Sequence, residues 1–205
     1  LGLAMALQGN PDAVQAVEEY TLPLTVSGEA RLLHGIHDPR HAQQLRPTWP
    51  ELVKAFQAGN GDVIADIGRV GGAETPEAVL EAADVVVMVL YPTLPMVDAA
   101  RPRLEVLRKV CGPSARIGLC LVNDGPYRPE EVQRALDFPL FGVLRYAKAN
   151  ARVLSDGAPQ PLSLMGPLLL NEMAMLGWRL RKTATEVADE ADRARSALTV
   201  PGSAR

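Results

Sequence analysis

Apolar runs alternate with amphipathic stretches along most of this chain. Short apolar runs are typical of strands buried in a sheet, and several occur. They are residues 30–36, 62–67, 85–90, 116–122 and 140–144. Apolar residues recur at helical spacing over 39–58, 75–82, 94–110, 129–136 and 150–155. Strands that alternate with crossover helices predict an α/β fold, with a doubly wound, mostly parallel sheet and helices on both faces.

A different pattern follows towards the end of the chain. Between residues 168 and 198 only Gly177 interrupts a helical pattern, which predicts one long C-terminal helix. Its apolar stripe consists of Leu169, Met173, Leu176 and Leu180. Beyond Lys182 the stripe thins among charges, as in a solvated or partner-bound extension. We therefore expect one α/β domain over 1–182 and a helical extension with a tail over 183–205. Residues 1–20 are also mostly helical in pattern.

Composition narrows the class of protein. The chain has 205 residues, 47% of them hydrophobic and 22% charged, which is typical of a globular domain. A formal net charge of -3 gives no general attraction to nucleic acid. The two cysteines, Cys111 and Cys120, have no disulfide-framework or metal spacing, so we expect reduced thiols and a cytoplasmic protein. No apolar stretch of membrane-spanning length occurs.

The predicted strand 62–67 carries the first candidate site. Asp66 stands near its carboxyl end, and Gly68, Gly71 and Gly72 permit a turn after it. Ligands of open α/β sheets bind outside the carboxyl ends of the strands, where Asp66 is expected. The alternatives are a carboxylate that caps nearby amides and a phospho-acceptor aspartate. The phospho-acceptor interpretation lacks the paired acids and the downstream lysine.

All three histidines lie within one short segment, at His34, His37 and His41. Imidazoles so close together could bind zinc. However, Asp38-Pro39 interrupts any helix that would align them on one face, and no cysteine lies nearby. We favour a loop between strand and helix, beside the ligand edge of the sheet.

Several segments carry patterns more specific than their secondary structure. They are DVIAD at 62–66, ADVVVMV at 83–89, GLCLVN at 118–123, FGVLRY at 141–146 and VLSDGAP at 153–159. In these motifs and their order, residues 30–180 resemble the ParA/MinD family of P-loop ATPases, especially its divergent actinobacterial members. The family's glycine- and lysine-rich phosphate loop and the strand that follows it would lie upstream of Leu1. We therefore expect the chain to be the body of a longer protein.

The resemblance implies ATP and Mg²⁺ as ligands. It places Asp66 on the water shell of the metal, as the catalytic residue, and Asn123, Arg145 and Tyr146 around the nucleotide. The side-chain amide of Asn123 would hydrogen-bond adenine, although Asn-Asp-Gly-Pro at 123–126 is equally a turn signal. Arg145 replaces the family's proline. Arg69 either meets phosphate across a dimer interface or is a surface arginine. Without the phosphate loop, the chain by itself is not expected to hydrolyse ATP.

The resemblance also implies partners. A ParA/MinD-like protein is an ATP-dependent homodimeric switch that positions DNA, a division site, or secretion or pilus machinery. Arg179, Arg181 and Lys182 form a basic cluster that either contacts DNA non-specifically or is a solvated helix face. The alternative function is an inactive scaffold that binds a partner protein through its sheet edge or its final helix.

Overall fold

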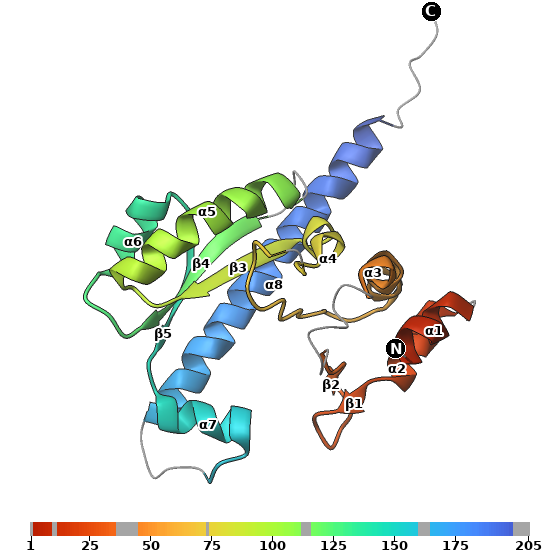
Figure 1. The fold of residues 1–205 in the computed structure, drawn as a ribbon, viewed down its shortest axis with the longest axis horizontal. Helices are drawn as coiled ribbons and strands as arrows, with labels where there is room; N and C mark the ends of the chain where they lie inside the picture. Colours follow the sequence, from red (N-terminus) through yellow and green to blue (C-terminus); the bar gives the residue numbers. More distant parts are fainter. Residues whose placement is uncertain are drawn as a thin grey trace, which may run out of the picture. The chain divides into compact units, whose positions relative to one another are not determined.

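The computed structural model describes residues 2–9, 12–35, 45–72, 74–111, 116–159 and 165–198. The chain divides into two compact units, Leu1–Ala82 and Ala83–Arg205. Each unit is treated by itself below, and Figure 1 labels their elements. None of the helices within these ranges is both long and apolar enough to cross a membrane.

The second unit contains a parallel sheet of three strands in the order β3-β4-β5. The strands are β3 (Val85–Leu90), β4 (Arg116–Asn123) and β5 (Leu140–Arg145). They are connected by helices α5 (Leu94–Val110) and α6 (Pro129–Leu136). The predicted ranges of all five elements are confirmed to within one residue at either end. The mixed helix and strand class, the parallel pairing and the long C-terminal helix are also confirmed.

The central strand is buried on both faces. Side chains alternate between the faces of a strand, and Leu119 and Leu121 on one face are as fully buried as Cys120 on the other. The outer strand β3 is less covered than its apolar sequence predicts, since Val89 is 61% exposed. A continuously apolar run is typical of a strand covered on both faces, but in β3 only the face of Val86 and Leu90 is buried.

The long helix α8 (Met165–Leu198) crosses one face of the sheet (Figure 1). A β-bulge lies in β5, because Leu119 pairs with Leu140 and Cys120 pairs with Gly142. The carbonyl of the bulged residue Phe141 accepts a hydrogen bond of 2.6 Å from Nη1 of Arg179 on α8. The absence of a side chain at Gly142 leaves room for Leu176, since a Cβ there would lie 2.9 Å from Leu176 Cδ1.

Two ion pairs attach α8 to the sheet. Glu172 forms an ion pair with Arg145 at the carboxyl end of β5, and Glu190 forms one with Arg116 at the amino end of β4.

The short helix α7 (Lys148–Asp156) follows β5 and ends at Gly157, whose φ of 62° is the left-handed conformation that favours glycine. The prediction for α7, 150–155, was correct in kind and two residues short at its start.

The first unit is mainly helical. Its elements are α1 (Gly2–Gly9), α2 (Ala13–Glu19), the 3₁₀ turn η2 (Arg46–Thr48), α3 (Trp49–Ala58), α4 (Glu77–Glu81), β1 (Leu22–Pro23) and β2 (Arg31–Leu32). The core of this unit is formed by Leu7, Ala16, Val17, Leu52 and Ala55. Pro47 and Pro50 stand near the starts of η2 and α3, as their fixed φ favours, so they divide the predicted helix 39–58. Residues 39–44 lie outside the described ranges.

Two predicted strands of the first unit differ from the structure. Of the described residues 30–35, only those of β2 form a strand, and β2 pairs antiparallel with β1 in a separate hairpin. Residues 62–67 are irregular, and Ile64 is 97% exposed. An apolar run favours strand conformation, but a strand also needs a neighbour to take its backbone hydrogen bonds. No strand among the described residues pairs with 62–67.

Candidate functional site at the carboxyl edge of the sheet

The carboxyl ends of β3, β4 and β5 meet at one edge of the second unit. Because parallel partners lie side by side, Asn123 at the end of β4 is directly beside Arg145 at the end of β5. Tyr91 follows β3 and Tyr146 follows β5. The predicted nucleotide residues Asn123, Arg145 and Tyr146 therefore lie together. Ligands of open α/β sheets bind at this kind of edge.

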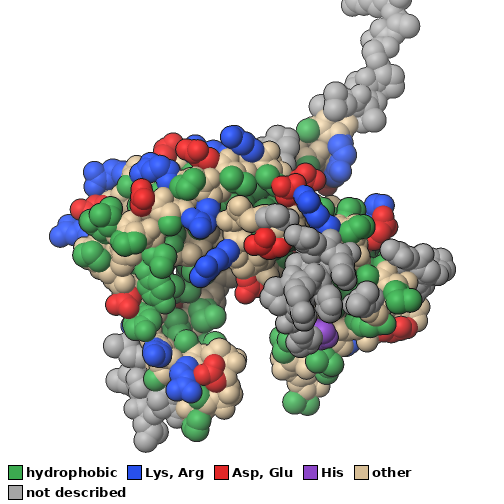
Figure 2. Space-filling view, in the orientation of Figure 1, with side chains coloured by type: hydrophobic (Ala, Val, Ile, Leu, Met, Phe, Trp, Pro, Cys, Tyr) green, Lys and Arg blue, Asp and Glu red, His purple; other side chains and the backbone are tan. Residues whose placement is uncertain are grey.

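Exposed aromatic side chains distinguish this edge. Three of the four tyrosines in the chain lie here. Tyr91 directly follows β3, Tyr127 lies in the loop after β4, and Tyr146 directly follows β5. The rings of Tyr91 and Tyr146 meet edge to face with centroids 6.1 Å apart, and Tyr146 is 48% exposed. Figure 2 shows green hydrophobic side chains gathered here, between α6 and α7. Aromatic faces open to solvent provide a surface on which a planar ring can stack.

The loops after β3 and β4 pack tightly on each other. The backbone N–H of Tyr127 donates a hydrogen bond of 3.3 Å to the carbonyl of Pro92. A Cβ on Gly125 would lie only 2.4 Å from the same oxygen, so this position requires glycine. Asn123 is exposed at the start of this turn. Both interpretations of Asn123, as a turn residue and as a ligand for a base, are compatible with its position.

Arg145 makes an ion pair that the sequence did not indicate. Its Nε and Nη2 donate to Glu172 Oε1 at 3.0 and 2.5 Å, and its backbone N–H donates to Oε2 at 2.8 Å. The hydrogen bonds from the Arg145 side chain lower the pKa of Glu172, and its backbone N–H and positive charge act in the same direction. The only signal in the sequence is an acid beside an apolar helical stripe.

The lowered pKa makes the contribution of this ion pair depend on pH. A group with a depressed pKa in the folded state stabilises the fold above its ordinary pKa, and this stability is lost as pH falls through the folded pKa. At about pH 6 we expect Glu172→Gln to lower the free energy of unfolding by about 1 kcal/mol. Denaturant unfolding across a pH series should show this difference vanish in acid. A difference that does not change with pH would contradict the assignment.

Asp66 belongs to the first unit. Its Oδ1 accepts a hydrogen bond of 2.9 Å from the N–H of Gly68, whose φ is 64°, so Asp66 caps a local turn. This is the geometry of the capping alternative, and Asp66 is exposed on an irregular segment rather than at the end of a strand. The expectation of Asp66 near the carboxyl end of a strand was therefore wrong. Its role towards Mg²⁺ stays a prediction.

Other predicted sites have intramolecular partners or lie outside the described ranges. His34 Nδ1 lies 3.1 Å from the carbonyl of Gly35, whereas His37 and His41 are not among the described residues. The described part of the chain contains no cluster of acids, histidines and cysteines suited to a metal.

The basic cluster predicted on the last helix also has intramolecular contacts. Arg179 donates a hydrogen bond to the backbone carbonyl at the β5 bulge. Lys182 lies 5.7 Å from the ring centroid of Trp178. Arg181 is exposed. The DNA prediction is untested.

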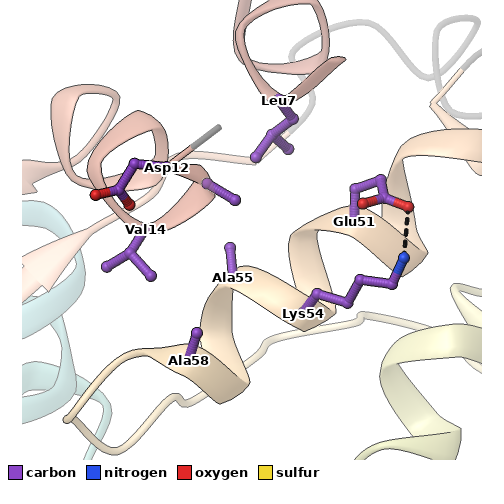
Figure 3. Close-up of a pocket in the computed structure, with 8 residues that line it drawn as sticks. Leu7, Asp12, Val14, Glu51, Lys54, Ala55 and Ala58 are labelled. Carbon is purple, nitrogen blue, oxygen red and sulfur yellow. Dashed lines mark hydrogen bonds and ion pairs between the residues drawn. The ribbon is translucent and has the colours of Figure 1, made fainter. Parts of the chain in front are cut away.

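A shallow groove of about 530 Å³ lies in the first unit (Figure 3). It is lined by Leu7, Asp12, Ala13, Val14, Glu51, Lys54, Ala55 and Ala58. Glu51 and Lys54 form an ion pair of 2.8 Å on α3, drawn as the dashed line in Figure 3. Asp12 accepts from the backbone N–H of Gln15 as the N-cap of α2. Because these polar groups have partners, the groove is a weaker candidate than the carboxyl edge.

The fold is similar to that of MinD proteins. The cell division ATPase MinD of Pyrococcus furiosus superposes with a TM-score of 0.64 and 20% identity, over 89% of this chain and 76% of that one. The septum site-determining protein MinD of Pyrococcus horikoshii, complexed with Mg-ADP, gives 0.58 and 20%, over 93% and 79%. No protein-family model matches the sequence, and no curated protein matches it significantly. These similarities establish a MinD-like fold.

Proposed function

We propose that this chain is the body of a ParA/MinD-like ATPase, a nucleotide-dependent switch that positions a cellular cargo. One observation carries the proposal: a MinD-like fold gathers Asn123, Arg145 and Tyr146 at the carboxyl edge of its sheet. Candidate cargoes are DNA, a division site, and secretion or pilus machinery. Residues 1–182 are the proposed nucleotide-binding domain, and 183–205 are its helical extension.

The proposed ligand is ATP with Mg²⁺. A MinD neighbour of the same fold was solved with Mg-ADP, which supports this class of ligand. The amide of Asn123 can both donate to and accept from a base edge, and the exposed ring of Tyr146 offers a stacking face. Asp66 is the proposed partner of the magnesium water shell.

The mechanism follows from differential affinity for two states. A nucleotide that binds the dimer more tightly than the monomer shifts the chain towards the dimer, and its loss reverses the shift. The sequence contains no Gly-x-x-x-x-Gly-Lys-Ser/Thr loop to hold phosphates. We therefore propose that this chain contributes the base-binding edge and that hydrolysis requires a phosphate loop supplied in addition.

The test is titration of the chain with ATP and Mg²⁺ by calorimetry, with sedimentation to follow dimer formation. We expect saturable binding that Asn123→Ala weakens about tenfold, because a lost base contact costs about 1–2 kcal/mol. The control is Asn171→Ala, which removes an exposed asparagine of α8. The absence of binding to the chain and to any longer form with a phosphate loop would contradict the proposal, as would equal effects of the two substitutions.

A second candidate function is an adaptor without catalysis. The outer edge of β3 has no strand partner among the described residues, and β3 carries neither a charge nor a proline to discourage pairing. On α8, Met175 and Trp178 are exposed. Both features are typical of surfaces that bind another protein. Concentration-dependent self-association without nucleotide would favour this function, and a monomer at all concentrations would argue against it.

A further inference from the structure

One carboxylate holds both the backbone and the side chain of the residue that ends β5. Glu172 accepts from the backbone N–H of Arg145 through Oε2, and from Nε and Nη2 of the same residue through Oε1. The β5 strand pairs only with β4 among the described strands. Glu172 therefore satisfies an N–H at the outer edge of the sheet and fixes the direction in which the chain leaves it.

The next residue in the chain is Tyr146, which makes the edge-to-face contact with Tyr91. An aromatic contact of this kind depends on the relative orientation of the two rings. Both Arg145 and Glu172 are about 30% exposed, so their ion pair is screened less than one on the open surface. Glu172 on α8 thus bonds the residue that directly precedes Tyr146 in the chain.

We infer that Glu172 is a positioning residue of the carboxyl-edge site: through Arg145 it holds Tyr146 against Tyr91, so that the pair presents a preformed surface to the planar ring of a ligand. The ligand part of this inference rests on the proposed nucleotide function. It also changes the role of Arg145. Because Glu172 balances its charge, Arg145 supports the aromatic pair at the base end of the site.

A simpler account is that Glu172 only attaches α8 to the sheet. The chain offers a matched control, since Glu190 makes an ion pair of the same length, 2.5 Å, with Arg116. Both acids lie on α8 and both arginines lie at strand ends. Arg116, however, begins β4 at the opposite edge of the sheet from the tyrosines. A role in helix attachment is common to both acids, whereas a role in positioning belongs to Glu172 alone.

The experiment compares Glu172→Gln with Glu190→Gln in the full chain. Aromatic NMR signals of the tyrosines, assigned with Tyr91→Phe and Tyr146→Phe, report ring positions without ligand. ATP with Mg²⁺ is then titrated by calorimetry. We expect Glu172→Gln to shift the Tyr91 and Tyr146 signals and to weaken ATP binding about tenfold, the scale of one lost charge-assisted hydrogen bond. Glu190→Gln should shift neither signal and change the affinity less than about twofold.

Unchanged tyrosine signals in Glu172→Gln would overturn the inference, and so would equal shifts in Glu190→Gln. If neither the chain nor a longer form with a phosphate loop binds ATP while Glu172→Gln still moves the rings, the proposed function fails but the positioning role is supported. Glu172→Asp provides a second variant, because it keeps the charge but is one methylene too short to hold both backbone and side chain. It should shift the same two signals, and unchanged signals there would also count against the inference.

Discussion

Replacing Leu119 by alanine is expected to destabilise the second unit by about 2–5 kcal/mol, the largest effect of any single truncation that we anticipate. Leu119 is 0% exposed and lies in the central strand, between β3 and β5. Truncation removes buried apolar atoms and leaves a cavity that close-packed neighbours fill only in part. A folded domain typically has a free energy of unfolding of about 5–15 kcal/mol, so this loss is a large share of its stability.

Amide hydrogen exchange of β3, β4 and β5, combined with urea unfolding, would measure this loss in the second unit itself. The matched control is Leu170→Ala on α8, where the side chain is 49% exposed. Removing an exposed leucine from a helix should change stability by less than about 0.5 kcal/mol. Similar losses for the two variants would show that Leu119 is not in a close-packed core.

The second large effect is expected from Gly125→Ala. Its Cβ would lie 2.4 Å from the carbonyl oxygen of Pro92, a backbone atom that cannot move without displacing the loop after β3. The same oxygen accepts from the N–H of Tyr127, so this contact between the loops would be lost as well. We expect a cost of about 1–3 kcal/mol in stability. Nucleotide binding should weaken at least about tenfold, because the base-binding edge is displaced.

Thermal unfolding and ATP titration of Gly125→Ala would test this expectation. Gly177→Ala is the control, because a Cβ at Gly177 in the middle of α8 meets no atom within 4 Å. There the substitution should stabilise the chain by about 0.5–1 kcal/mol, since alanine loses less backbone entropy than glycine. The same replacement of glycine by alanine is thus expected to lower stability at position 125 and to raise it at position 177. A stabilising Gly125→Ala would refute the tight packing of the two loops.

The elements of the second unit could be predicted because each has a strong local signal. The run Val85–Leu90 is continuously apolar and mostly β-branched, and α5 and α6 begin with a proline near the first turn. Strand–helix–strand order then implies parallel neighbours, and parallel neighbours share one carboxyl edge. These steps place Asn123, Arg145 and Tyr146 at the same edge of the sheet.

The strand predictions for the first unit were less accurate than those for the second unit, for a physical reason. Residues 30–36 and 62–67 have strand-like composition, but pairing depends on a partner that lies far away in the chain. Among the residues of these segments that the structure describes, Arg31–Leu32 pair within a local hairpin and 62–67 are irregular. A capping hydrogen bond within two residues, from Gly68 to Asp66, needs no such partner, and it is present.

Local periodicity and turn chemistry were thus enough to assign strands, helices and a shared ligand edge in residues 83–198. Which side chains meet across that edge depended on three-dimensional packing. The contact of Glu172 with Arg145 joins residues 27 positions apart, and the β5 bulge turns a carbonyl towards Arg179. Contacts of this kind leave no periodic trace, because they arise from how a helix lies across a sheet and not from the conformation of either element.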